Sequence, residues 1–191
     1  MHIRKKWAAL ALASTLAAAS LAGCSAGTQA NKYGLDEFVM VLIPGEDTEK
    51  SVQLRDNMAA AMSEALGVKV TTYRATDYSA AVEAMRTGNA QLALLGPFSY
   101  VTATERAGAE CICVTAEKGT DGGYQSYSVA PAGSDIETLA DLKDKTFAFV
   151  DPESTSGNVV PTNEILNAMP ELGLTFDDLH TDGKYFKSAM F

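Results

Sequence analysis

Short runs of apolar residues alternate along the chain with longer stretches in which apolar and polar residues follow a helical period. The continuous apolar run at 38–43 predicts a strand that is buried on both faces. Similar runs predict further strands at 68–73, 90–95, 111–114, 124–129 and 146–150. Helical periodicity predicts intervening helices at 48–66, 77–88 and 98–107. This alternation predicts an α/β fold whose mostly parallel strands are covered by helices.

The predicted helices of the first half carry recognisable start and stop residues. Asp77 is expected to cap the second helix, and Gly67 and Gly88 are expected to end the first and the second. The apolar stripe of the first helix is expected to face the sheet, and it consists of Leu54, Met58, Ala61, Met62, Ala65 and Leu66.

The second half repeats the alternation with more irregular elements. The sequence from Ser134 to Glu137 has the form of a capping box and predicts a helix that runs to Leu142. A helix is expected at 157–169, with an irregular first turn before Pro161 restarts it. A short helical turn is expected at 174–179, and Tyr185 and Phe186 suggest the start of a last strand.

The first 23 residues form a pattern of their own. Arg4, Lys5 and Lys6 precede an apolar run at 7–21, which is short for a membrane-spanning helix and predicts a secretory signal. The Leu-Ala-Gly-Cys sequence that ends at Cys24 resembles a lipobox. The resemblance implies cleavage before Cys24, diacylation of that cysteine and anchoring of the chain to the outer face of the membrane, with 24–35 as a polar tether. A plain signal peptide with a chance cysteine is the alternative.

The charge balance limits the classes of partner. The chain has 15 Lys and Arg against 24 Asp and Glu, and its formal net charge is −9. Removal of the basic leader makes the remainder more acidic. An acidic surface argues against nucleic acid and against electrostatic binding to anionic lipid. Any anion site must therefore use local dipoles and hydroxyl groups.

Cysteine and histidine are too sparse to support much chemistry. Cys111 and Cys113 flank Ile112 in an apolar run, and we expect them to be buried thiols. Their spacing is poor for a disulfide and too short for a zinc site without further ligands. Apart from His2 in the leader, His180 is the one histidine of the chain, so a histidine-based metal site or triad has no basis. We expect no cofactor and no metal.

Three consecutive hydroxyl residues stand where a predicted strand passes into a predicted helix. Ser154, Thr155 and Ser156 lie between the Asp151-Pro152 turn and Gly157. The first N–H groups of a helix lack internal partners and carry partial positive charge. Hydroxyl groups beside them add donors that can rotate toward a tetrahedral oxyanion. An ordinary serine N-cap is the alternative.

Other hydroxyl and phenol groups follow the ends of predicted strands, where ligands bind in open α/β sheets. Tyr78 and Ser79 start one helix, and Ser99 and Tyr100 start another. Tyr124 follows the polar, glycine-rich stretch at 118–123. Each tyrosine taken alone could equally be a packing residue.

The order of these stretches resembles the substrate-binding proteins of phosphonate, phosphite and phosphate ABC transporters. The matching stretches are Leu66-Gly67-Val68-Lys69-Val70, Thr76-Asp77-Tyr78, Gly96-Pro97-Phe98-Ser99-Tyr100, Gly123-Tyr124-Gln125-Ser126, Asp141-Leu142-Lys143 and Phe149-Val150-Asp151-Pro152-Glu153-Ser154-Thr155-Ser156-Gly157 with Pro161. The last stretch is the most specific, and the resemblance covers the chain from about Phe38 to its last residue.

The resemblance implies the fold and the function of a type II periplasmic binding protein, in which two α/β lobes close on a ligand about a hinge. It implies that Ser154, Thr155 and Ser156 bind the oxygens of the anion and that Tyr78 and Tyr124 contribute from the cleft walls. It also implies delivery of the anion to a transporter permease. The family's histidine and acidic ligands match nothing here, and His180 does not lie in the family's histidine motif.

The expected organisation has four parts: a signal at 1–23, the tether at 24–35, a first lobe at 36–119 and a second lobe at 120–191. The glycine-rich stretch at 118–123 is expected to carry the chain between the lobes. The second lobe has few strands, which is thin for a domain core, and we expect the chain to be a fragment of a longer protein.

Two other kinds of function remain open on the residues alone. A lobe of the same fold could bind another small ligand or serve a sensory role. A serine-dependent hydrolase is less well supported, because the residues near Ser154 that could act as a base are the weakly basic Asp151 and Glu153. We therefore expect a binding protein and no enzyme.

Overall fold

A three-stranded parallel sheet forms the first half of the fold in a computed structural model, which describes residues 33–116, 119 and 122–191. Its strands are β1 (Glu37–Leu42), β2 (Lys69–Arg74) and β3 (Leu92–Leu94) in the order β2-β1-β3. Met40 of β1 lies opposite Thr72 of β2 and Leu92 of β3. The central strand is the most apolar, as expected for a strand with neighbours on both sides.

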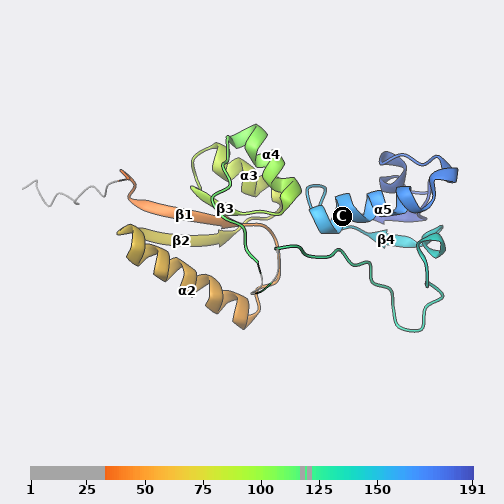
Figure 1. Ribbon diagram of the computed structural model, residues 1–191, viewed down its shortest axis with the longest axis horizontal. Helices are drawn as coiled ribbons and strands as arrows, with labels where there is room; N and C mark the ends of the chain where they lie inside the picture. Colours follow the sequence, from red (N-terminus) through yellow and green to blue (C-terminus); the bar gives the residue numbers. More distant parts are fainter. Residues whose placement is uncertain (1–32, 117–118, 120–121) are drawn as a thin grey trace, which may run out of the picture. The chain divides into compact units, whose positions relative to one another are not determined.

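A helix follows each of these strands, and the three helices lie on both faces of the sheet (Figure 1). They are α2 (Glu49–Leu66) on one face and α3 (Tyr78–Arg86) and α4 (Pro97–Ala107) on the other. Capping residues set their ends: Thr48 caps α2, Asp77 caps α3 through the Ala80 N–H at 2.7 Å, and Gly67 ends α2 in the left-handed conformation. The alternation predicted from the sequence is confirmed here.

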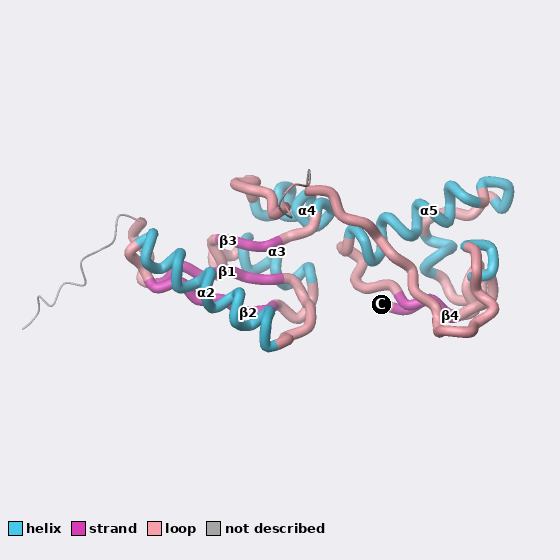
Figure 2. Tube along the Cα trace, turned by 60° about the horizontal axis from the view of Figure 1, so that its bottom comes forward, coloured by secondary structure: helices cyan, strands magenta, loops and turns pink. Residues whose placement is uncertain are grey.

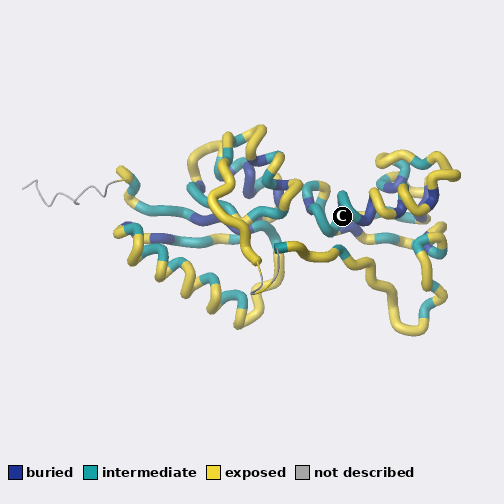
Figure 3. Tube along the Cα trace, in the orientation of Figure 1, coloured by how far each residue is buried: buried dark blue, intermediate teal, exposed yellow. Residues whose placement is uncertain are grey.

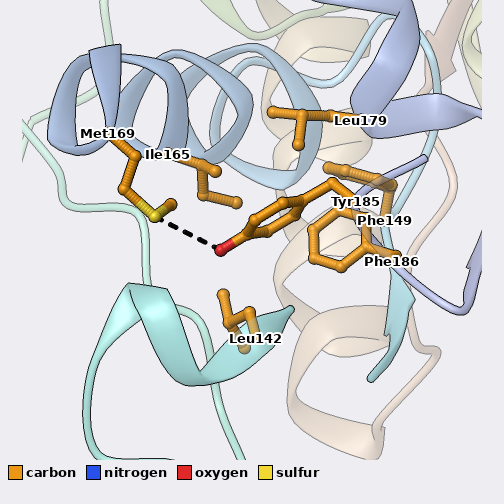
Figure 4. Close-up of a cluster of buried hydrophobic side chains, with 7 residues drawn as sticks. All are labelled: Leu142, Phe149, Ile165, Met169, Leu179, Tyr185 and Phe186. Carbon is orange, nitrogen blue, oxygen red and sulfur yellow. Dashed lines mark hydrogen bonds between the residues drawn. The ribbon is translucent and has the colours of Figure 1, made fainter. Parts of the chain in front are cut away.

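A second, two-stranded parallel sheet follows, and its strands are β4 (Thr146–Ala148) and β5 (Ser188–Met190). The intervening chain forms the π turn η2 (Thr155–Val159), α5 (Val160–Ala168), and the 3-10 turns η3 (Pro170–Leu172) and η4 (Asp177–His180). The irregular turn expected ahead of Pro161 is present, because η2 precedes the restart of the helix. Figure 4 shows the core behind it, which comprises Leu142, Phe149, Ile165, Met169, Leu179, Tyr185 and Phe186.

The prediction of a strand is wrong for two stretches of the chain. The stretches 111–114 and 124–129 are irregular and mostly exposed, as Figures 2 and 3 show, and Val129 is 93% exposed. The expectation of buried thiols is also wrong, because Cys111 and Cys113 are both exposed and free. A strand needs a neighbouring strand to satisfy its backbone, and neither stretch pairs with another strand among the described residues.

Two element boundaries and one helix face also differ from the prediction. The helix expected from Ser134 is only the 3-10 turn η1 (Leu139–Leu142), which is capped by Thr138. Hydrogen bonds from the Thr138 hydroxyl and from the Thr138 and Glu137 N–H groups lower the pKa of the Asp141 carboxyl in that turn.

The strand predicted at 146–150 ends at Ala148, and Val150 is 62% exposed. On α2, the predicted apolar stripe is wrong, because Leu54, Met58, Ala61 and Ala65 are exposed and only Met62 and Leu66 of the stripe are half-buried.

The predictions for the leader, for Cys24 and for most of the tether concern residues outside the described part of the chain. The lobe boundary near residue 120 stays a prediction. None of the helices in the described part of the chain has the length and apolarity needed to cross a membrane. In the same residues, no group of histidine, cysteine and acidic side chains could hold a metal ion.

Candidate functional site

The loop that carries Ser154, Thr155 and Ser156 joins β4 to α5, and its own hydrogen bonds fix its shape. Ser154 is buried, and its Oγ accepts a hydrogen bond from the Gly157 N–H at 3.1 Å. The Ser154 carbonyl accepts from the N–H groups of Asn158 and Val159, each at 3.1 Å. Ser154 is therefore an N-cap, which is the alternative left open by the sequence, while its hydroxyl hydrogen remains available to donate.

Gly157 lets this loop close tightly against the end of β4. A methyl group on Gly157 would lie 2.4 Å from Val150 Cγ2, 2.5 Å from Val150 Cβ and 2.8 Å from Ser154 Oγ. The Val150 N–H donates to the Gly157 carbonyl at 3.1 Å, so the two backbones are held together. The absence of a side chain at Gly157 is a steric requirement of this loop.

Thr155 lies at the N-terminus of α4. Its Oγ1 accepts a hydrogen bond from the Phe98 N–H at 2.8 Å. The backbone N–H groups at a helix start carry partial positive charge, so this position favours an electron-rich oxygen. Since Thr155 Oγ1 accepts here, its hydroxyl hydrogen is free to donate to a ligand.

Several hydroxyl groups converge on Gly96, the N-cap of α4. A methyl group on Gly96 would lie 3.2 Å from Thr155 Oγ1, 3.8 Å from Ser99 Oγ and 3.8 Å from the Tyr124 phenol oxygen. Ser99 is fully buried, and its Oγ accepts from the Gly96 N–H at 3.0 Å. The structure therefore places Thr155 and Tyr124, two of the predicted site residues, around the same glycine.

Ser156 and Tyr78, two further predicted site residues, are linked to neighbouring segments by hydrogen bonds of their backbone groups. The Ser156 carbonyl accepts a hydrogen bond from the Ser126 hydroxyl at 2.6 Å, which attaches the stretch after Tyr124 to the loop. Tyr78 is buried at the start of α3, and its N–H donates to Asp151 Oδ2 at 3.3 Å. Tyr78 is thus tied to the loop by its backbone.

Two carboxylates of the loop bind groups other than the α4 terminus. Asp151 accepts from the N–H groups of Tyr78 and, at 2.8 Å, Glu153. Glu153 Oε1 accepts from the Ser79 hydroxyl at 3.2 Å and lies 3.8 Å from an Arg106 guanidinium nitrogen. Because these acids bind α3 and Arg106, the α4 N-terminus meets hydroxyl groups instead of a negative charge.

Two pockets lie beside the loop of Ser154 to Ser156. Hollows of about 530 and 810 Å³ are lined by the 125–131 stretch, η1 and α5. Only the larger one includes loop residues, among them Ser156 and Gly157. Volumes of this size suit drug-sized ligands, whereas a tetrahedral oxyanion of a few atoms needs only a small set of convergent donors.

Sequence reasoning did not assign a role to Ser99, Asn158 or His180. The Ser99 hydroxyl was identifiable only as part of a helix start. Asn158 and His180 make a partly buried hydrogen bond between residues that are 22 positions apart, and no local pattern reveals such a pair.

Comparisons with known proteins identify the family to which the chain is similar. A family model described as ABC transporter, phosphonate, periplasmic substrate-binding protein matches residues 40–188. The chain is 35% identical over 162 residues to the phosphate-import protein PhnD of Mycolicibacterium smegmatis, covering 82% of this chain and 50% of that protein. It is 36% identical over 104 residues to the phosphonates-binding periplasmic protein of Escherichia coli, covering 52% of this chain and 31% of that protein.

Solved structures show the same fold. A binding-protein component of an ABC phosphonate transporter from Pseudomonas aeruginosa superposes with a TM-score of 0.68 at 25% identity, over 81% of this chain and 49% of that one. PhnD1 from Prochlorococcus marinus, solved with methylphosphonate, gives a TM-score of 0.55 at 23% identity, over 82% of this chain and 56% of that one, and this likeness concerns the fold alone. The chain thus spans half or less of the curated relatives, and the predicted α/β fold of the type II binding-protein kind is confirmed.

Proposed function

Because the chain belongs to the periplasmic substrate-binding proteins of phosphonate ABC transporters, we propose that it captures a phosphonate, phosphite or phosphate anion and delivers it to a transporter permease. The family is one of binding proteins and not of enzymes, as expected from the sequence. A role outside the cell's cytoplasmic compartment follows from the same family assignment.

The convergence of Thr155 and Tyr124 around Gly96 is the observation that supports this proposal most directly, because the Ser99 hydroxyl there is buried and donates to the Gly96 carbonyl. In the proposal, Ser154, Thr155 and Ser156 donate to the anion oxygens at the start of η2 and α5. Tyr78 and Tyr124 complete the site from the side of α3 and from the stretch after residue 122. Donors of this kind suit an oxyanion because helix N-termini and hydroxyl groups bind negative charge without a cation.

The names of the relatives support a tetrahedral phosphorus anion without choosing among its forms. One relative is named for phosphate import and another for phosphonates, and one related structure contains methylphosphonate. These ligands share a face of three oxygens, which three adjacent hydroxyl residues can meet. A lobe of the same fold for another small ligand, or one with a sensory role, is the alternative.

Calorimetric titration of the protein with methylphosphonate, phosphite and phosphate tests the proposal. At least one should bind with saturation, and sulfate and acetate, used as matched anions without phosphorus, should bind more weakly. Failure of all three phosphorus anions to bind, or equal binding of acetate, would rule out the proposed function.

We also propose a division into lobes at 36–119 and 120–191. In its support, the strands β1 to β3 and the strands β4 and β5 belong to separate sheets. Closure of such lobes requires a few residues that absorb the change in backbone angles, and the glycine-rich 118–123 stretch is the proposed location.

Cys24 is expected to be the lipidated first residue of the mature protein. The basis is the lipobox after a short apolar run, and two acyl chains on one residue anchor a protein firmly. Mass spectrometry of the membrane fraction should find a diacylglyceryl group on Cys24, and a Cys24→Ser variant should lack it. Recovery of an unmodified chain in the soluble fraction would contradict this prediction.

A further inference from the structure

A polar network formed by the buried Asn158 and Thr162 and the half-buried His180 lies directly behind the loop of Ser154 to Ser156. Asn158, in η2, is 2% exposed, and Thr162, on α5, is fully buried. Asn158 Oδ1 lies 2.6 Å from His180 Nε2 and 3.3 Å from the Thr162 hydroxyl oxygen, which donates to it. The network joins η2, α5 and η4 at one point.

The hydrogen bonds of Asn158 define the direction of the bond from His180. The Asn158 amide nitrogen donates to the Pro152 carbonyl at 2.8 Å, so the amide oxygen must face His180. An amide oxygen only accepts, and His180 Nε2 therefore donates to it. The opposite orientation would place the amide oxygen against the Pro152 carbonyl and leave both acceptors without a hydrogen.

The position of the His180 ring is itself fixed. Its Nδ1 lies 2.8 Å from the Phe176 carbonyl oxygen, which likewise only accepts, so both contacts are hydrogen bonds in a ring that carries an N–H on each nitrogen. The ring also packs against aromatic rings with centroid separations of 4.5 Å to Phe149, 4.6 Å to Phe176 and 5.4 Å to Phe191. Because these contacts hold the ring, the Nε2–H of His180 points in a fixed direction and can hold Asn158 Oδ1 in place.

Asn158 connects His180 to both ends of the loop. Its side chain binds the Pro152 carbonyl before Ser154, and its N–H donates to the Ser154 carbonyl at 3.1 Å. We propose that His180 is a positioning residue for the anion loop, which acts by donating from Nε2 to Asn158 Oδ1 and thereby fixes the turn from Pro152 to Asn158. This inference rests on the proposed function as far as anion affinity is concerned.

Aromatic packing alone is the rival role for His180, and two substitutions separate the roles. His180→Phe keeps an aromatic ring among Phe149, Phe176 and Phe191 but removes the donor. His180→Gln keeps an N–H donor at about the reach of Nε2 but removes the ring. If His180 positions the loop, His180→Phe should reduce anion affinity more than His180→Gln. If its ring only packs, His180→Gln should reduce affinity more than His180→Phe.

The experiment measures anion affinity by calorimetry with methylphosphonate and phosphate, and stability by urea unfolding, for the protein and both variants. His180→Phe should weaken binding about three- to tenfold, the loss expected for one hydrogen bond. His180→Gln should bind like the wild type even though it unfolds at a lower urea concentration than His180→Phe. Affinities that fall in the same order as stabilities, or a His180→Phe variant with unchanged affinity, would overturn the proposal.

Amide hydrogen exchange without ligand gives a readout that is independent of the proposed function. The N–H groups of Gly157 and Asn158 bond to Ser154 within the loop, so their exchange reports its order. Their exchange should quicken in His180→Phe and stay close to the wild type in His180→Gln. If the wild type binds no phosphorus anion, the proposed function fails, while these exchange rates still decide the positioning role.

Discussion

Replacing Thr155 by alanine is expected to weaken binding of the phosphorus anion by about ten- to a hundredfold, since a hydrogen bond to a charged group contributes roughly 1.5–3 kcal/mol. Thr155 Oγ1 accepts from the Phe98 N–H, so its hydrogen is free to point at a ligand, and its oxygen is held at the start of α4. Thr155 is half-buried, so the free energy of unfolding should change little. Calorimetric titration with methylphosphonate, phosphite and phosphate measures the effect.

Two control variants sharpen this measurement. Thr155→Ser keeps the hydroxyl group and should bind within a few-fold of the wild type. Thr102→Ala removes the same atoms from the body of α4, four residues after Phe98, and should leave affinity unchanged. If Thr155→Ala binds every one of the three anions as tightly as the wild type, Thr155 is no ligand.

Replacing Gly157 by alanine is expected to lower both stability and anion affinity. The new methyl group would lie 2.4–2.5 Å from Val150 Cγ2 and Cβ, well inside contact distance. Overpacking of this kind costs about 1–3 kcal/mol, which corresponds to a fall in Tm of about 2–10 °C for a chain of this size. The loop must shift to relieve the contact, and Ser154 would lose its hydrogen bond from the residue 157 N–H. Thermal unfolding and titration with methylphosphonate measure the two effects.

A second-site change tests the steric cause. Val150 Cβ is fixed by the backbone, so rotation of the side chain cannot relieve the contact, whereas Val150→Gly removes it. The double variant Val150→Gly/Gly157→Ala should therefore bind better than Gly157→Ala alone. Val150 is 62% exposed, so its own removal costs little burial. If Gly157→Ala unfolds and binds like the wild type, the tight approach of the loop to β4 has been misjudged.

The parts of the fold that the sequence predicted correctly depend on local interactions. Asp77 caps its helix through the N–H group three residues away, and Pro161 follows an irregular turn that its own missing N–H helps to explain. The hydroxyl loop was recognisable because its residues are adjacent. These features need no knowledge of the rest of the chain.

The errors concern features that need distant partners. The stretches 111–114 and 124–129 have the apolar and β-branched residues of strands, yet composition does not reveal whether a neighbouring strand is present. The same applies to Cys111 and Cys113, whose burial would have required that neighbour. The bond from His180 to Asn158 likewise depends on η4 folding back against η2.

The α4 N-terminus, where hydroxyl groups instead of a lysine or arginine meet Gly96, has a consequence for the effect of salt. Hydrogen bonds from hydroxyl and N–H groups act at contact, whereas the repulsion between an anion and a chain of net charge −9 acts over a distance of about a Debye length, roughly 10 Å at 0.1 M salt. Added salt therefore screens the repulsion and leaves the contacts intact. Association with an anion should therefore quicken as ionic strength rises, which is the reverse of the salt effect at a site that attracts its ligand with a cation.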